Sequence, residues 1–167
     1  MPLKFDHPPL LAPGRHAMGL GDIEALCVSP FTGPARARRE KLFYALEAVV
    51  QDLLTAHIRC DVFADGSFFT EKPEPDDIDI IVSIDVSEFD ALDEAQLQII
   101  EALNTGEIAF VDSIAVTSYP RDHPYRGFGL DCEGLVEGYG LEHAQVYLKG
   151  YAVLKLWETD VGNRICS

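Results

Sequence analysis

The chain has 167 residues, of which 47% are hydrophobic, and this size and composition suit one compact domain with a sizeable core. The formal net charge of −15 opposes attraction to polyanions, so we expect no broad nucleic-acid-binding surface and no membrane partner. The sequence has no secretory signal, no apolar run long enough to span a bilayer, and four cysteines scattered without a C-x-x-C pair. We therefore expect a cytoplasmic protein with reduced thiols.

The first 33 residues are rich in proline and glycine, with Pro8-Pro9, Pro13-Gly14 and Gly33-Pro34. This composition predicts an irregular arm, with one helical turn around residues 22–27, that packs on a single domain formed by residues 34–167.

A helix is predicted over residues 34–57, because leucines and valines recur there at steps of three and four. Its start is crowded with basic residues, although the helix dipole disfavours positive charge at that position: Arg36, Arg38, Arg39 and Lys41. Two interpretations are open. Either one or two arginines face a phosphate or an acidic partner, or they form a solvated face paired with the many carboxylates.

The next segment combines a strand over 58–64, a turn at Gly66-Ser67, a proline-rich loop and a second strand over 77–84. Glycine lets a ligand approach the backbone closely, and the following serine offers an N–H and a hydroxyl that suit phosphate oxygens. In the second strand Asp77 and Asp79 point to the same face, with α-carbons about 6–7 Å apart. Two carboxylates on one face can hold a hard divalent cation.

Farther along, a helix is predicted over 93–104 and a third strand over 107–119. Asp112 is the one acid in the apolar part of that strand, and a buried carboxylate needs a partner, a cation or a shifted pKa. We interpret Asp112 as a third metal ligand; the alternative is an aspartate at a strand edge that reaches water. Two further strands, over 144–148 and 151–157, are expected to close the sheet.

The spacing Gly66-Ser67, nine residues, Asp77-Ile78-Asp79 resembles the signature of the nucleotidyltransferase-fold superfamily, which is related to DNA polymerase beta. The same segment matches the pattern Gly-Ser-Phe-x-Thr-x-Lys-x-x-Pro-x-Asp-Ile-Asp of small bacterial proteins similar to that superfamily. The segment from Pro13 to His16 resembles their Pro-Gly-x-His start, although His16 suits a surface or capping role better. The resemblance implies an α/β (α+β) domain with a minimal nucleotidyltransferase fold, a mixed β-sheet flanked by helices.

The resemblance also implies a mechanism. Two Mg²⁺ ions would be held by Asp77, Asp79 and Asp112, which would also be the catalytic residues. The nucleoside triphosphate would be bound by Gly66, Ser67, Thr70 and Lys72. A nucleoside monophosphate, with AMP as the expected group, would move to a hydroxyl acceptor on a protein or an RNA. Arg121, His123 and Arg126 could position the acceptor or the pyrophosphate, and ordinary loop polarity explains them equally well. Small proteins of this kind often resemble members of toxin–antitoxin or phage-defence loci, so the resemblance implies such a context as one expectation.

Two alternatives to the transferase remain. The first is a protein of this fold without catalysis, an antitoxin or assembly partner that binds a basic protein partner through its acidic surface. The second is a metal-dependent hydrolase that uses the same acids.

Overall fold

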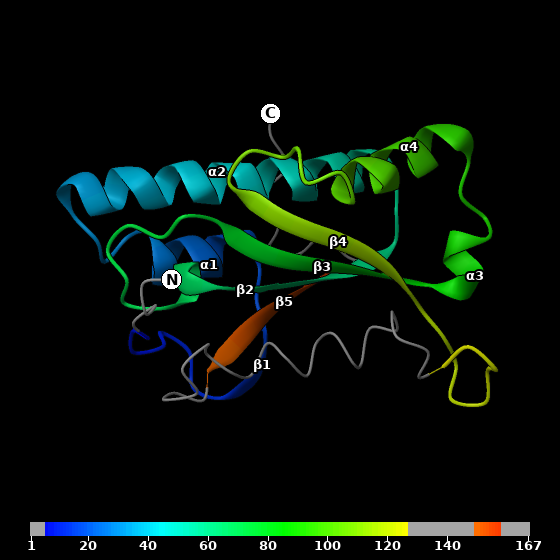
Figure 1. Ribbon diagram of the computed structural model, residues 1–167, viewed down its shortest axis with the longest axis horizontal. Coiled ribbons are helices and arrows are strands. Elements are labelled where there is room, and N and C mark those ends of the chain that lie inside the picture. The colour runs from blue at the N-terminus through cyan, green and yellow to red at the C-terminus, as the bar shows by residue number, and fades with distance from the viewer. Residues whose placement is uncertain (1–5, 127–148, 158–167) are drawn as a thin grey trace, which may run out of the picture.

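The computed structural model describes residues 6–126 and 149–157, and in these residues five strands form one mixed β-sheet with helices packed against it (Figure 1). The predicted class, a mixed sheet flanked by helices, is confirmed. The strand order is β1-β5-β2-β3-β4. Strand β2 is antiparallel to both of its neighbours, whereas β1 pairs with β5, and β3 with β4, in parallel. The bounds of the strands are β1 Gly14–Ala17, β2 Cys60–Asp65, β3 Ile78–Asp85, β4 Val111–Ser118 and β5 Gly150–Leu156.

Helix α2, which runs along one face of the sheet, matches the long helix predicted from the periodicity (Figure 1). Its apolar residues pack with those of α1 and α4 on the face of the sheet that also carries Ile78, Ile80 and Val82. Strand β3 therefore has one face in this core, and Asp79 lies on the opposite face. The helices are α1 Leu20–Cys27, α2 Gly33–Thr55, α3 Val86–Phe89 and α4 Glu94–Leu103, with a 3₁₀ turn η1 at Ser67–Phe69.

The opposite face of the sheet has a second, smaller apolar cluster. Because side chains alternate along a strand, the residues two positions from this cluster share its face. Asp65 follows Phe63 of the cluster in this way, and Asp79 precedes Ile81. The acids at the end of the sheet therefore lie on the face opposite the main helical core. The buried members of the cluster are Phe63, Ile81, Val116, Tyr151 and Val153.

The first 33 residues are less irregular than predicted, because they contain β1 and the two-turn helix α1. Strand β1 adds to the edge of the sheet beside β5, and Arg15 Nε donates a hydrogen bond of 3.0 Å to Tyr151 Oη. Its four residues show no apolar alternation, since three of them are exposed. The sequence therefore gave no strand signal there, and only the pairing with a distant strand defines it.

The third predicted strand begins later than expected, at Val111 rather than residue 107. Phe110 has a positive φ of 66°, and Val111 N donates to Ile108 O at 3.2 Å, so a turn precedes the strand. The strand predicted over residues 144–148 lies outside the described residues. No helix in the described parts of the chain has the length and apolar character needed to cross a membrane.

Candidate functional site

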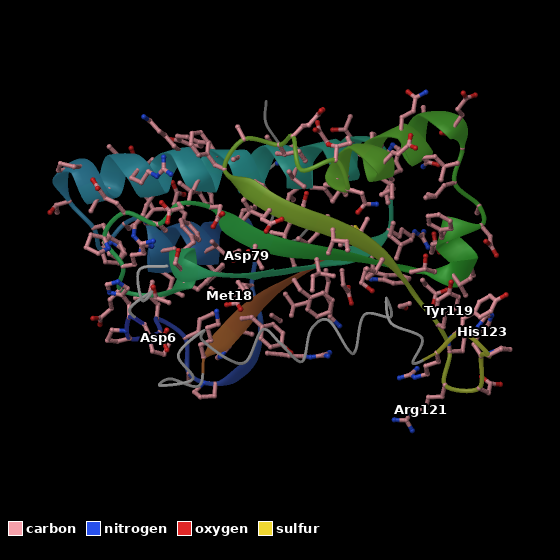
Figure 2. All side chains as sticks on the ribbon, viewed as in Figure 1. Asp6, Met18, Asp79, Tyr119, Arg121 and His123 are labelled. Carbon is pink, nitrogen blue, oxygen red and sulfur yellow. The ribbon has the colours of Figure 1, made fainter. Side chains whose placement is uncertain are left out.

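Three aspartates form a row across neighbouring strands at one end of the sheet. Asp79 of β3 is paired in register with Asp65 of β2 on one side and with Asp112 of β4 on the other. Paired residues of adjacent strands have α-carbons about 5 Å apart and side chains on the same face. The predicted proximity of Asp79 and Asp112 is therefore a property of the strand register. Figure 2 shows Asp79 at the start of β3, at this end of the sheet.

Like charges directly across a sheet are unfavourable, and the row is partly compensated by a buried lysine. Lys149, which directly precedes β5, has Nζ at 3.0 Å from Asp65 Oδ2, and both side chains are almost completely buried. Burial raises the pKa of Asp65 from 3.8 to about 7, while the charge of Lys149 opposes this and the charge of Asp79 adds to it. The other carboxylate oxygen, Asp65 Oδ1, is buried without a hydrogen-bond partner.

Gly66 brings the turn directly against the row of acids. Its φ of 92° lies in the region that favours glycine, and a Cβ on Gly66 would overlap Asp79 Oδ2 and lie 3.3 Å from the Asp79 nitrogen. Ser67 then begins the 3₁₀ turn, and Phe69 N donates to Gly66 O at 3.1 Å. The predicted Gly-Ser turn therefore lies next to Asp79, one of the predicted acids.

The loop that follows the turn is held from the inside by Arg39 of α2, whose side chain is fully buried. Its guanidinium donates to four carbonyl oxygens at 2.6–2.9 Å, those of Cys27, Phe68, Thr70 and Lys72. It also lies over the ring of Phe31 at 3.7 Å from the centroid. Burial lowers the pKa of Arg39 to about 10, so the guanidinium stays charged at neutral pH.

Neither interpretation of the arginines at the start of α2 describes Arg39 or Arg38. Arg38 Nε and Nη2 donate to Pro75 O and Asp76 O, each at 2.8 Å. Both arginines therefore bind backbone carbonyls of the loop between Gly66 and Asp77. Arg36 and Lys41 fit the solvated interpretation, since both are exposed, and Arg36 forms an ion pair with Glu40 at 2.9 Å.

Two predicted nucleotide-binding residues have partners within the loop itself. Thr70 is buried, and its hydroxyl donates to Ser67 O at 2.8 Å and accepts from Lys72 N at 3.2 Å. Lys72 Nζ forms an ion pair with Asp76 Oδ2 at 2.8 Å, and its side chain is 30% exposed. Thr70 thus shapes the loop, whereas the ammonium group of Lys72 pairs with an exposed carboxylate, and exposed ion pairs are weak. Phe68 and Phe69 are fully buried core residues.

The predicted metal ligands do not form a complete cage. Asp77 lies one residue before β3, and Asp112 is exposed on β4, which is the last strand of the sheet in the part of the chain that the structure describes. The premise that Asp112 is a buried carboxylate was therefore wrong. Its register with Asp79, which the sequence did not reveal, nevertheless places the two residues side by side. Among the described residues, no group of three or more His, Cys, Asp or Glu side chains is arranged to hold a metal ion.

The donor set nevertheless suits a magnesium-bound nucleotide in part. Mg²⁺ in nucleotide enzymes is usually held by one or two carboxylates together with substrate phosphates, and Asp79 and Asp112 supply two carboxylates. With Asp65 and Lys149 included, the row has a net charge of about −2 when all three acids are ionised. The orphaned Asp65 Oδ1 and the close approach allowed by Gly66 are further features that a cation and a phosphate would use.

The loop over 119–126 lies at the other end of β4, about 23 Å from Asp112 at the usual rise per residue of a strand. Figure 2 shows Tyr119, Arg121 and His123 together there, away from Asp79. The rings of Tyr119 and His123 stack at 4.6 Å, and Arg126 Nη1 donates to Tyr119 O at 2.9 Å. This separation speaks against a role of the loop in binding the pyrophosphate next to Asp79.

Sequence reasoning missed Asp65 and Lys149. Asp65 directly precedes the Gly-Ser turn, and the period of two in the strand from Asp61 could have placed it on the face of the later acids. Lys149 offered no local signal, since only the pairing of β5 with β2 brings the two together. His16 lies in β1, and its Nε2 is 2.7 Å from Ala12 O, so its partner is local.

The fold and the site define a mixed α/β domain with a row of carboxylates and a glycine turn at one end of its sheet. The chain belongs to the family described as "Family of unknown function (DUF6932)", whose model matches residues 3–160. No curated protein and no solved structure matches the chain.

Proposed function

We propose that the protein is a magnesium-dependent nucleotidyltransferase that moves a nucleoside monophosphate, with AMP as the expected group, from a nucleoside triphosphate to a hydroxyl of a protein or an RNA. The observation that carries the proposal is the register of Asp79 with Asp112, directly beside the Gly66-Ser67 turn. The resemblance of the segment from Gly66 to Asp79 to the nucleotidyltransferase-fold superfamily supports it. A cytoplasmic location agrees with the two described cysteines, Cys27 and Cys60, which are buried free thiols.

In this proposal, the backbone of Gly66 and Ser67 holds the β- and γ-phosphates, and Lys72 leaves Asp76 to contact them. The acceptor oxygen attacks the α-phosphorus in line; a new phosphorus–oxygen bond forms, the bond to the β-phosphate oxygen breaks, pyrophosphate leaves, and the hydroxyl proton passes to water. Asp79 and Asp112 would hold Mg²⁺, with Asp77 at the start of the strand as a further ligand. When bound, the metal supplies charge stabilisation and lowers the pKa of the acceptor hydroxyl.

The test uses purified protein with Mg²⁺ and each α-labelled nucleoside triphosphate, alone and with cell lysate, followed by separation of protein from RNA. We expect label on one class of macromolecule with the wild type. The variant Asp79→Asn should reduce this by about 100- to 1,000-fold, because one preorganised charge at the reacting centre is lost.

The matched control is Asp85→Asn, which changes the last residue of the same strand. Asp85 caps α3, with Oδ1 accepting from Ser87 N at 2.9 Å, and asparagine caps a helix equally well. Transfer should therefore be retained in Asp85→Asn. Undiminished transfer by Asp79→Asn would sink the assignment.

A specific observation also favours the second function, a binding protein of this fold without catalysis. Asp65, one acid of the row, is already neutralised by Lys149, while the whole chain carries a formal net charge of −15. Such a protein would act through its acidic surface as an antitoxin or assembly partner of a basic protein. Co-purification of a basic protein, together with the absence of label in every nucleotide reaction, would establish this function in place of the transferase.

A further inference from the structure

We infer that Arg38 and Arg39 are positioning residues for the proposed transfer, because they fix the loop from Gly66 to Asp76 and set the distance between the segments that carry the acids. This inference rests on the proposed function and adds two residues to it that lie on α2, outside the Gly-Ser and acid motifs.

Arg39 holds the inner part of the loop. Three of its four acceptors are carbonyl oxygens of alternate loop residues, Phe68, Thr70 and Lys72. Carbonyl oxygens carry partial negative charge and would repel a phosphate, so their engagement by a buried cation leaves the loop better suited to an anion. The fixed fork of the guanidinium can serve several acceptors in one geometry, which an ammonium group cannot.

Arg38 holds the outer part and connects the two acid-bearing segments. Its bonds to Pro75 O and Asp76 O fix the residues that directly precede Asp77. Its guanidinium also lies 4.9 Å from the ring centroid of Phe110, two residues before Asp112. Ile78 N in turn donates to Phe110 O at 3.0 Å. A single side chain thus touches the start of both segments whose acids pair in register.

The two arginines act on different parts of the reaction. Loss of Arg39 frees the carbonyls beside the Gly-Ser turn, so binding of the triphosphate should weaken. Loss of Arg38 lets the starts of β3 and β4 move apart, so the acids lose their alignment. A misplacement of about 1 Å at a reacting centre can cost on the order of 100-fold in rate.

The experiment compares Arg38→Gln, Arg39→Lys and a control, Arg36→Gln, with the wild type. Arg36 lies on the same helix turn, but its ion pair with Glu40 is exposed. We would measure kcat and KM for transfer, the Kd of the magnesium–ATP complex by calorimetry, and hydrogen exchange of the loop amides. Circular dichroism and the active fraction establish how much protein is folded.

We expect Arg38→Gln to lose on the order of 100-fold in kcat/KM and the control to change by less than about twofold. Arg39→Lys should raise the KM and the Kd for the nucleotide and speed exchange of the loop amides. A purely structural role would lower the folded fraction while the remaining molecules kept the wild-type KM and Kd, and that outcome would overturn the inference.

Because Arg39 is fully buried, its variant could fail to fold, and Arg38, which is more accessible, provides the second test. In Arg38→Ala, added guanidinium chloride should restore transfer, whereas sodium chloride at the same concentration should not. A wild type that binds no nucleotide overturns the proposed function and this inference with it. A wild type that binds and transfers, with Arg38→Gln equally active or Arg38→Ala not rescued, overturns the inference alone.

Discussion

The two ends of the β-sheet carry polar side chains of similar kinds in different surroundings. At one end, Asp65 and Lys149 form a buried ion pair, and Arg39 is fully buried against loop carbonyls. At the other end, Arg59 and Glu88 are 3.9 Å apart and Tyr125 is 62% exposed. Buried polar groups need defined partners, whereas exposed ones are served by water. The difference indicates that the buried polar groups with fixed partners are concentrated at the end of the sheet with the Gly-Ser turn.

Among the variants that test this difference between the two ends, Lys149→Met should lower the free energy of unfolding most. The change leaves the carboxylate of Asp65 buried without its counter-charge, and breaking such a pair costs about 3–5 kcal/mol. Lys155→Met, on the exposed side of the same strand, should change the free energy of unfolding by less than about 0.5 kcal/mol. Urea denaturation at about pH 8 measures both. Equal losses of unfolding free energy in the two variants would show that the buried ion pair of Lys149 contributes no more to stability than an exposed lysine does.

The pH dependence of stability provides a second test of the end with the Gly-Ser turn, because Asp65 has a raised pKa. Burial raises its pKa from 3.8 to about 7, so between these values the native state binds a proton that the unfolded chain has released. The native state therefore loses stability as the pH rises through this window. Each pKa unit corresponds to about 1.4 kcal/mol, so the loss in the free energy of unfolding across this window is about 4 kcal/mol at most.

The measurement compares the wild type with Asp65→Asn, by denaturant unfolding at about pH 5 and about pH 8. The wild type should lose more stability between the two values than the variant, which has no carboxyl at this position. If both proteins lost the same free energy of unfolding between the two pH values, the pKa of Asp65 would be the same in the native and the unfolded chain, which contradicts the prediction.

Gly66→Ala tests the close approach of the turn to Asp79. Both Gly66 and Gly106 have positive φ, but a Cβ on Gly106 would meet nothing within 4 Å, so Gly106→Ala reports backbone strain alone. We expect Gly66→Ala to cost about 1–3 kcal/mol more, because the new methyl group displaces the Asp79 carboxylate. Thermal or urea unfolding gives the difference, and equal losses would remove the evidence for tight packing there.

The smallest effect is expected at the far end of the sheet. Tyr125→Ala and Arg121→Ala change exposed side chains of the loop over 119–126. Each should alter the free energy of unfolding by less than about 0.5 kcal/mol. A larger loss in urea unfolding would mean that the ring cluster of this loop stabilises the fold.

The fold was predictable where a pattern repeats along one element. In α2 the leucines and valines recur over several helical turns. In β3 the apolar side chains alternate at Ile78, Ile80 and Val82. Strand β1 was not predictable, because it is short and exposed and is defined by pairing with β5.

The site was predictable to the extent that its residues share one motif. Gly66 and Asp79 are brought together by the loop between them, whereas Lys149 reaches Asp65 only through the sheet. The arginines at the start of α2 were visible as an unfavourable crowding of charge. Their partners are backbone carbonyls, which every residue carries, so the sequence contained no record of which ones Arg38 and Arg39 bind.

The position of β5 between β1 and β2 has a consequence for the order in which the chain can fold. Residues 14–17 and 60–65 have no direct contact as strands until residues 150–156 are inserted between them, and the bond from Arg15 to Tyr151 spans 136 residues. Contacts of such sequence separation form slowly. Lys149 arrives with the same segment, so the charge of Asp65 is compensated in the step that completes the sheet. A nascent chain whose residues 150–156 are still inside the ribosome therefore has an incomplete sheet, and its Asp65 lacks the lysine that compensates the carboxylate.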